Sequence, residues 1–235
     1  MSNAQPIYLL ADSQPLFPRG DRPSILREIA DLLPRRHQRA AYVGASNGDD
    51  PRFFSIFESA LHTVGMTERR QVMASFCDLD ADYLRSADLI LLAGGDVARG
   101  WDALVRTGMR EVIRQRYESG AILVGVSAGA VQLGLGGNYA LDVQPASELR
   151  TFGFVEHWID VHDESADWSR LRRFLSLTGS GAVGFGIPTG AALVCGSAGE
   201  LAPRIAPVTR FTVRPTGVSG EAIEATSRLF ERPTV

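Results

Sequence analysis

The 235-residue chain contains no lysine, so its 24 Lys and Arg residues are all arginine. Neither a Ser-Lys catalytic dyad nor a Schiff base on a lysine amine is therefore available to it. Cysteine is scarce as well, because Cys77 and Cys195 stand far apart and form no C-x-x-C pair. This scarcity argues against a zinc site and a disulfide framework, and it indicates a reducing compartment.

Other absences narrow the class of protein further. No apolar run approaches the length of a membrane span, and the N-terminus lacks a basic region followed by a long apolar stretch. We therefore expect a soluble, cytoplasmic protein without a membrane partner. The formal net charge of −3 argues against a nucleic-acid partner. No His and carboxylate spacing resembles a ligand set, so neither a metal nor a cofactor is expected.

What is present is an alternation of short apolar segments with longer amphipathic ones. The chain is 45% hydrophobic and 22% charged, which suffices for one full core. The segments predicted as buried strands are Ile7–Ala11, Ala40–Ala45, Asp88–Ala93 and Ala121–Val126. The segments with helical spacing are Pro23–Leu33, Pro51–Val64 and Val97–Tyr117. This order predicts an α/β fold of three layers, with a mainly parallel sheet between helices.

After residue 136 the sequence pattern changes to glycine-rich turns and shorter extended segments. These segments are Gly153–Val161, Ala182–Ile187 and Ala191–Val194. We interpret them as a continuation of the same domain, with some antiparallel strands in the C-terminal third. The prediction is thus a single α/β domain over residues 1–235, of which residues 231–235 are expected to be loose.

The most specific motif is a strand that ends at Ser127 and continues as a helix. Gly125 and Gly129 flank the serine in the G-x-S-x-G pattern of a nucleophile elbow, where a sharp turn brings the backbone close to its neighbours. The pattern predicts that Ser127 is an exposed nucleophile at the carboxyl edge of the sheet. The alternative is a glycine-lined turn in which the serine is an ordinary helix N-cap.

A second strand, Leu89–Ala93, runs into Gly94-Gly95-Asp96. The N–H of Gly95, paired with the N–H of Ala128, would form a two-donor oxyanion hole beside an elbow serine. The alternative is a strand terminator with Asp96 as the N-cap of the next helix. Asp96 also counts as a candidate substrate-binding residue.

With lysine absent, the base for a serine nucleophile is sought among the four histidines. His37 and His62 are most simply surface or helix-face residues. His157 and His162 lie near the end of a predicted strand, five residues apart, which places them on opposite faces. His162 stands where the strand gives way to polar residues, ahead of a helix expected from about Ser165 to Leu177. That position suits an active-site base.

These blocks resemble the peptidase E and cyanophycinase family of serine peptidases. The resemblance rests on Gly94-Gly95-Asp96, on the segment 125–130 and on the segment 159–162 with arginines at 170 and 173, in that order. It implies a class I glutamine amidotransferase-like fold and hydrolysis of a peptide or isopeptide bond next to an acidic residue. It also implies Ser127 as nucleophile, His162 as base, and Gly95 and Ala128 as oxyanion donors.

One departure from the family concerns the third member of the triad, which is usually a glutamate. The corresponding block here is Gly186-Ile-Pro-Thr-Gly190, so Thr189 stands where the resemblance implies an acid. A hydroxyl orients an imidazole but does not stabilise its charged form. Asp160, Asp163 and Glu164 are the carboxylates nearest to His162 in sequence, and the choice among them stays open.

Arg170 and Arg173 lie one helical turn apart after the predicted base and are candidates to bind a substrate carboxylate. The alternative is a solvated basic helix face paired with nearby acids. Two functions remain open on the sequence. The first is a serine hydrolase acting on a peptide or small amide; the second is a catalytically degenerate homologue that binds or regulates. A carboxylate within hydrogen-bond reach of His162 would favour the first.

Overall fold

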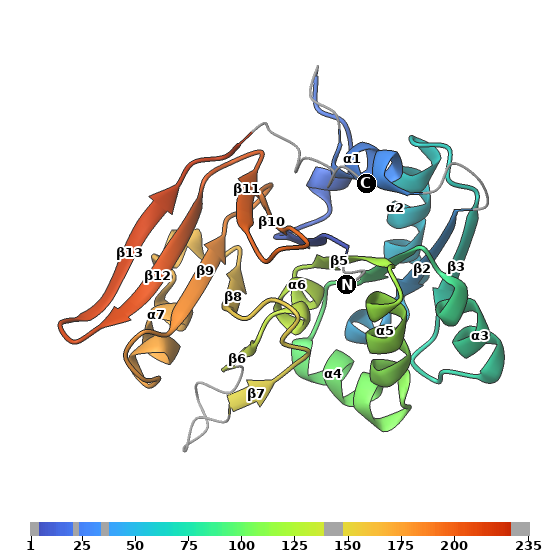
Figure 1. Cartoon of the computed structure of the whole chain (residues 1–235). Coiled ribbons are helices and arrows are strands. Elements are labelled where there is room, and N and C mark those ends of the chain that lie inside the picture. Colours follow the sequence, from blue (N-terminus) through green and yellow to red (C-terminus); the bar gives the residue numbers. More distant parts are fainter. Residues whose placement is uncertain (1–4, 21–23, 34–37, 139–147, 227–235) are drawn as a thin grey trace.

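A computed structural model describes residues 5–20, 24–33, 38–138 and 148–226. The residues expected to be loose, 231–235, and the first residue of the helix predicted from Pro23 lie outside these ranges. The described chain forms a large α/β layer structure and, beside it, a smaller sheet built by the C-terminal third (Figure 1).

The main sheet has seven strands in the order β11-β10-β1-β5-β4-β2-β3. Strands β1, β5, β4, β2 and β3 are mutually parallel, and β10 and β11 extend the sheet in antiparallel fashion at the β1 edge. Their bounds are β1 Ile7–Leu10, β2 Arg39–Val43, β3 Glu68–Val72, β4 Leu89–Leu92, β5 Ile122–Val126, β10 Ala192–Cys195 and β11 Leu201–Arg204. The predicted parallel core is therefore confirmed.

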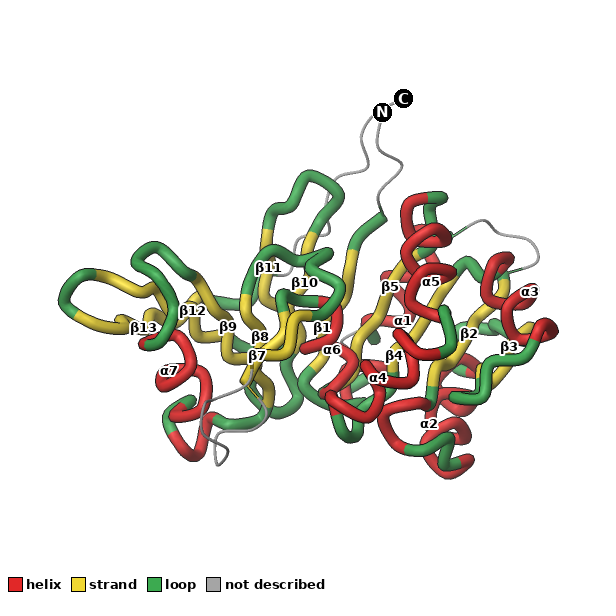
Figure 2. The backbone as a smooth tube through the Cα atoms, turned by 90° about the horizontal axis from the view of Figure 1, so that it is seen from below, coloured by secondary structure: helices red, strands yellow, loops and turns green. Residues whose placement is uncertain are grey.

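Helices cover both faces of this sheet. Successive strand residues point to opposite sides, so each strand contributes apolar side chains to both cores. Leu9 and Leu123 face one core with α3 (Asp78–Ser86), α4 (Val97–Arg106), α5 (Met109–Glu118) and α6 (Ala128–Leu133). Tyr8 and Val124 face the other core with α1 (Ile25–Leu32) and α2 (Pro51–His62). Seen from below, α4, α5 and α6 lie in front of the strands of this sheet (Figure 2). The predicted three-layer α/β fold is confirmed.

Two details of the prediction for this region are wrong. The single helix expected over Val97–Tyr117 is two helices, α4 and α5, because Gly108 adopts a left-handed conformation with φ 78° between them. Between the second and third predicted strands, the sequence predicted one helix only, which corresponds to α2. That interval also holds β3 and α3. Because β3 is an edge strand and α3 is largely exposed, both are rich in polar residues and lack the apolar pattern of a buried element.

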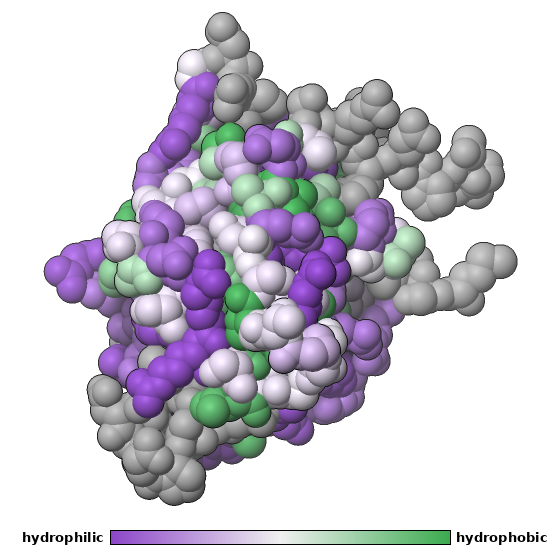
Figure 3. Space-filling view, turned by 90° about the vertical axis from the view of Figure 1, so that its left-hand side faces the viewer, coloured by the Kyte–Doolittle hydropathy of each residue, from purple (hydrophilic) through white to green (hydrophobic). Residues whose placement is uncertain are grey.

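The C-terminal third forms a second, four-stranded sheet in the order β13-β12-β9-β8. Its strands are β8 Trp158–Val161, β9 Val183–Ile187, β12 Val208–Arg214 and β13 Gly217–Ile223, and α7 (Ser169–Ser176) packs on it through a separate apolar cluster. A short pair, β6 Gly136–Asn138 and β7 Glu148–Arg150, completes the described strands. Seen from this side, polar and apolar residues interleave over the surface (Figure 3).

The expected antiparallel strands of the C-terminal third are present, with two corrections. The extended piece predicted over Gly153–Val161 is a strand only from Trp158, and the helix expected from about Ser165 is a short 3-10 turn, Glu164–Ala166, followed by α7. Strands β8 and β9 pair in parallel within the second sheet, an arrangement on which the sequence gave no prediction. This sheet carries the end of β8 toward the carboxyl edge of the main sheet, where His162 meets Ser127.

Candidate active site

Ser127 occupies a strained turn between β5 and α6. Its backbone has φ 49° and ψ −109°, a conformation that costs a non-glycine residue free energy and is typical of functional turns. The flanking glycines make the turn possible. A Cβ on Gly129 would lie 2.1 Å from the carbonyl oxygen of Leu92, and a Cβ on Gly125 would lie 2.5 Å from the nitrogen of Ala130. The geometry is that of a nucleophile elbow.

Gly94 and Gly95 follow β4 and lie beside the elbow. A Cβ on Gly94 would be 3.3 Å from the Cβ of Ser127, so this glycine lets the two turns approach each other. Gly95 has φ 134°, and a Cβ there would lie 2.2 Å from the carbonyl oxygen of Ser46. Within the described part of the chain, neither the Gly95 N–H nor the Ala128 N–H donates a hydrogen bond. Both donors are therefore available to a bound oxyanion.

His162 lies against Ser127 although the two residues come from different sheets. The Ser127 Oγ and the His162 Nε2 are 2.8 Å apart, which is hydrogen-bond distance. His162 directly follows β8 and has φ 43°, and its N–H donates to the carbonyl oxygen of Ile187 in β9. The second sheet thus fixes the backbone of the histidine, and the left-handed turn directs its ring toward the elbow.

The other histidines in the described ranges, His62 and His157, lie away from Ser127. His62 ends α2 at the surface, in keeping with its interpretation as a helix-face residue, and His37 lies outside the described residues. His157 packs edge-on against Phe185 with 5.2 Å between ring centroids. Burial lowers the pKa of His157, which favours its neutral form.

Among the described residues, no carboxylate forms a hydrogen bond or an ion pair with the His162 ring. Two of the three acids proposed from the sequence pair with Arg170 instead. Its Nη2 donates to Asp160 Oδ1 at 3.1 Å, and its Nε lies 3.6 Å from Asp163 Oδ2. Burial raises the pKa of the Asp160 carboxyl against the opposing effect of Arg170.

Glu164 is held beside the position where the resemblance implies an acid. The backbone N–H of Thr189 donates to Glu164 Oε1 at 3.1 Å. Partial burial alone would raise the pKa of the Glu164 carboxyl. Hydrogen bonds from its own backbone and from Thr189, together with the nearby charge of His162, outweigh burial and lower this pKa. These contacts favour the ionised form of Glu164.

Sequence reasoning missed Asp12, which follows β1 at the same edge of the sheet. Asp12 Oδ2 accepts a hydrogen bond of 2.7 Å from the N–H of Gly190, so the turn after β9 is held by a carboxylate on either side, Asp12 and Glu164. The signal was available, since β1 is the parallel neighbour of β5 and the loops that follow parallel strands meet at one edge.

A cavity of about 280 Å³ opens in front of Ser127 and His162. It lies between the loop after β1, helix α2 and the ends of β4 and β5. The larger side chains in its lining are Leu16, Tyr42, Phe53, Ile56, Phe57, Leu91 and Val126. None of these was predicted as a site residue, because apolar side chains that line a cavity resemble ordinary core positions in a sequence.

The remaining candidates lie outside this lining. The Asp96 carboxylate caps α4 by accepting the Arg99 N–H at 2.7 Å, so the N-cap alternative describes its contact. Arg173 is exposed in the last turn of α7, and Arg170 is held by the two aspartates. In the described ranges, no group of three His, Cys, Asp or Glu side chains is placed to hold a metal ion.

The sequence model of Peptidase family S51 matches residues 9–199 of this chain. The chain belongs to Peptidase family S51. That match includes strands of both sheets, the elbow and His162, and it agrees with the resemblance drawn from the three sequence blocks. Membership of a peptidase family makes a peptide the expected class of substrate for the S51 chain.

Two solved structures have the same fold. The crystal structure of a peptidase from an acI-B1 Actinobacterium aligns with a TM-score of 0.69 at 20% identity, over 94% of this chain and 95% of the other. A putative peptidase E protein from Listeria monocytogenes EGD-e aligns with a TM-score of 0.62 at 15% identity, over 85% of this chain and 98% of the other. Comparison with curated protein sequences gave no match. No described helix of the S51 chain is long and apolar enough to cross a membrane.

Proposed function

We propose that this S51 chain is a serine-type hydrolase of a peptide or small amide bond, with Ser127 as nucleophile and His162 as base. The observation that supports this most is the 2.8 Å contact between Ser127 Oγ and His162 Nε2 at a strained elbow. A serine hydroxyl needs such a base, because it is a weak nucleophile while it keeps its proton.

In the proposed reaction, His162 Nε2 takes the Ser127 proton as Oγ adds to the scissile carbonyl carbon. The N–H groups of Gly95 and Ala128 stabilise the resulting oxyanion. Collapse of the tetrahedral intermediate breaks the C–N bond, and His162 gives its proton to the leaving amine. Water then attacks the acyl-enzyme with His162 again as base, which releases the acid and frees Ser127.

Glu164 supplies the negative charge nearest to the position of the missing acid. It acts on His162 through space and not through a hydrogen bond, and it lies at an exposed site next to Thr189. Solvent screens such an interaction, which is worth about 0–1 kcal/mol. A buried, hydrogen-bonded acid contributes about 10⁴-fold to the rate of a serine peptidase. The enzyme therefore works as a Ser-His dyad with weak electrostatic support.

Replacing Glu164 by glutamine is expected to lower kcat/KM only about 3-fold, because a screened charge interaction below about 1 kcal/mol changes the rate less than tenfold. The difference from wild type disappears in about 1 M salt, where the Debye length is about 3 Å.

The control for that variant is Asp163→Asn. Asp163 pairs with Arg170, so this variant should leave kcat/KM unchanged. A loss of about 10³-fold or more in Glu164→Gln would contradict the weak role assigned to Glu164 and indicate a direct hydrogen bond to His162 in the substrate complex.

A second function is favoured by one observation, the lack of a carboxylate hydrogen bond to His162 among the described residues. In that alternative the chain is a catalytically degenerate peptidase homologue that binds a peptide and does not turn it over. Tight, saturable binding of a peptide without release of product would support it.

Labelling with a fluorophosphonate probe distinguishes the two functions. An activated serine attacks phosphorus and displaces fluoride, whereas an ordinary serine does not react. We expect wild type to gain the mass of one probe less HF on the peptide that contains Ser127. Ser127→Ala and heat-unfolded wild type should gain none. A folded wild type that stays unlabelled at high probe concentration would refute the hydrolase.

A further inference from the structure

The cavity in front of Ser127 differs from what an acidic substrate needs. A carboxylate that leaves water must be paired with a cation or several hydrogen-bond donors. Among the described residues that line the cavity there is no arginine, and Asp12 contributes a negative charge. Arg170, the candidate clamp, is held by Asp160 and Asp163. Arg19, near Gly190, hydrogen-bonds to Gln14 and does not line the cavity.

The wall of the cavity on the side of α2 is apolar and partly exposed. Phe53 is 49% exposed and Ile56 is 38% exposed, and both face the same cavity as the buried Phe57. Spacings of three and four residues place these side chains on one side of the helix. Large apolar side chains that remain in contact with water at the mouth of a site gain free energy when a ligand covers them.

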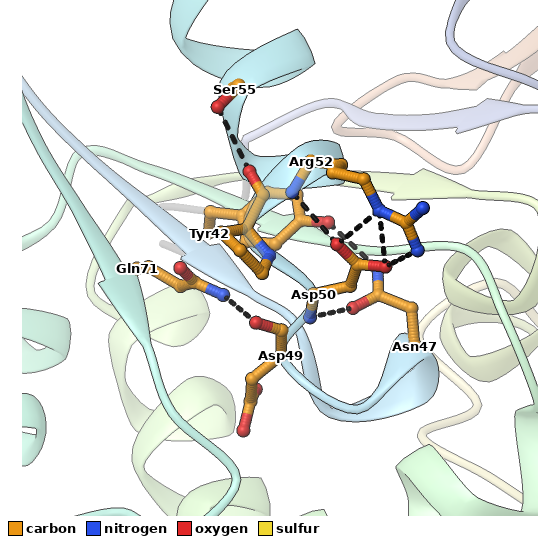
Figure 4. A network of polar contacts seen from close by, with 8 residues as sticks. Tyr42, Asn47, Asp49, Asp50, Arg52, Ser55 and Gln71 are labelled. Carbon is orange, nitrogen blue, oxygen red and sulfur yellow. Dashed lines mark hydrogen bonds and ion pairs between the residues drawn. The ribbon is translucent and has the colours of Figure 1, made fainter.

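This wall is held in place by a polar network at the start of α2 (Figure 4). Asp50 caps the helix by accepting the Arg52 N–H at 2.9 Å. Asn47 joins the loop to the sheet: its Oδ1 accepts the Asp50 N–H, and its Nδ2 donates to the Tyr42 hydroxyl at 2.9 Å. Gln71 of β3 donates to the carbonyl oxygen of Asp49.

Tyr42 adds an aromatic side to the cavity. Its ring lies 5.5 Å, centroid to centroid, from that of Phe54 and at the same distance from that of Phe57. Burial raises the pKa of Tyr42 to about 12, so its hydroxyl stays neutral at physiological pH. This side of the cavity is therefore aromatic and uncharged.

We propose that the cavity is the specificity pocket of the enzyme and takes a bulky apolar side chain, aliphatic or aromatic, next to the scissile bond. This inference rests on the proposed hydrolase function. The volume of the cavity, about 280 Å³, lies just below the usual range of ligand pockets, which suits one side chain and not a long peptide. Acidic substrates are disfavoured by the apolar wall and by the carboxylate of Asp12.

The test measures kcat/KM on two matched substrate series. The first varies the acyl residue in aminoacyl 4-nitroanilides through Ala, Leu, Phe and Asp, and the second varies the leaving residue of dipeptides through the same four. In at least one series we expect Leu or Phe to exceed Ala by about 10-fold, the discrimination typical of an apolar pocket. We expect Asp to fall below Ala in that series. A preference for Asp, or less than about 3-fold selectivity in both series, would overturn the proposal.

Two variants tie any selectivity to the pocket. Ile56→Arg places a cation in the wall, so it should lower the preference for Leu over Asp by at least about 10-fold. Val105→Arg changes an apolar side chain on α4 that is 46% exposed and lies outside the cavity, and it should leave the preference unchanged. Equal preferences in Ile56→Arg and wild type would overturn the assignment of the pocket.

Fluorophosphonate labelling in the same preparations separates the two possible failures. A wild type that is labelled at Ser127 but shows no apolar preference refutes the pocket and leaves the hydrolase intact. A folded wild type that is neither labelled nor active refutes the hydrolase, and the specificity inference fails with it.

Discussion

Ser127→Ala should lose at least about 100-fold in kcat/KM, and the size of this loss follows from the missing acid. In a complete triad, removal of the serine or of the histidine alone costs about 10⁶-fold, whereas removal of the acid alone costs about 10⁴-fold. No carboxylate is hydrogen-bonded to His162 in the described structure, so the wild-type rate already lacks the contribution of the acid. The ratio of the two losses, about 100-fold, is therefore the loss in rate expected when the serine is removed. Initial rates on the preferred apolar substrate measure it.

Ser119→Ala is the matched control, since Ser119 is an exposed residue at the end of α5 whose hydroxyl bonds only to the helix backbone. It should keep the activity of wild type within about 2-fold. Both variants should unfold at the temperature of wild type, because removing one hydroxyl at either position creates no cavity. Undiminished turnover by Ser127→Ala would remove the serine from the mechanism.

Gly129→Ala should have the largest effect on stability. The added Cβ would lie 2.1 Å from the carbonyl oxygen of Leu92, and this contact joins two backbone segments that no side-chain rotation can separate. Overpacking of a core costs about 1–3 kcal/mol and at times more, so we expect about 3 kcal/mol here. For a chain of this size that corresponds to a fall in Tm of about 6–12 °C.

The same substitution should also reduce kcat/KM by about 10²-fold, because the shifted helix moves the Ala128 N–H and the Ser127 hydroxyl together. Gly179→Ala is its control: a Cβ there meets no atom within 4 Å, so Tm and activity should stay unchanged. A Gly129→Ala variant with the Tm of wild type would mean that the elbow is not packed against β4 as described.

The parallel sheet and the elbow could be predicted from the sequence because their signals are local. Buried strands read as apolar runs, and the glycines around Ser127 are required by contacts between adjacent strands and the helix. Strand β3 was missed because an edge strand such as Glu68–Val72 needs little apolar surface.

The second sheet and the environment of His162 depend on long-range contacts that no local pattern encodes. The pairing of β8 with β9, which positions His162, joins segments about 25 residues apart that read only as short extended pieces. The binding of Asp160 and Asp163 to Arg170 could not be predicted either, since the same spacing is compatible with a carboxylate on His162. The same holds for the apolar wall of the cavity, since Phe53 and Ile56 resemble core residues in sequence.

The central claim is that Ser127 carries an acyl group during turnover, and burst kinetics with intact-mass measurement test it most directly. Mixing the enzyme with a 4-nitrophenyl ester of an apolar acid should release one equivalent of 4-nitrophenol per chain before the steady state. The acyl mass should then appear on the peptide containing Ser127 and be absent in Ser127→Ala. Steady turnover without a burst and without acylation of Ser127 in rapidly quenched samples would contradict the account.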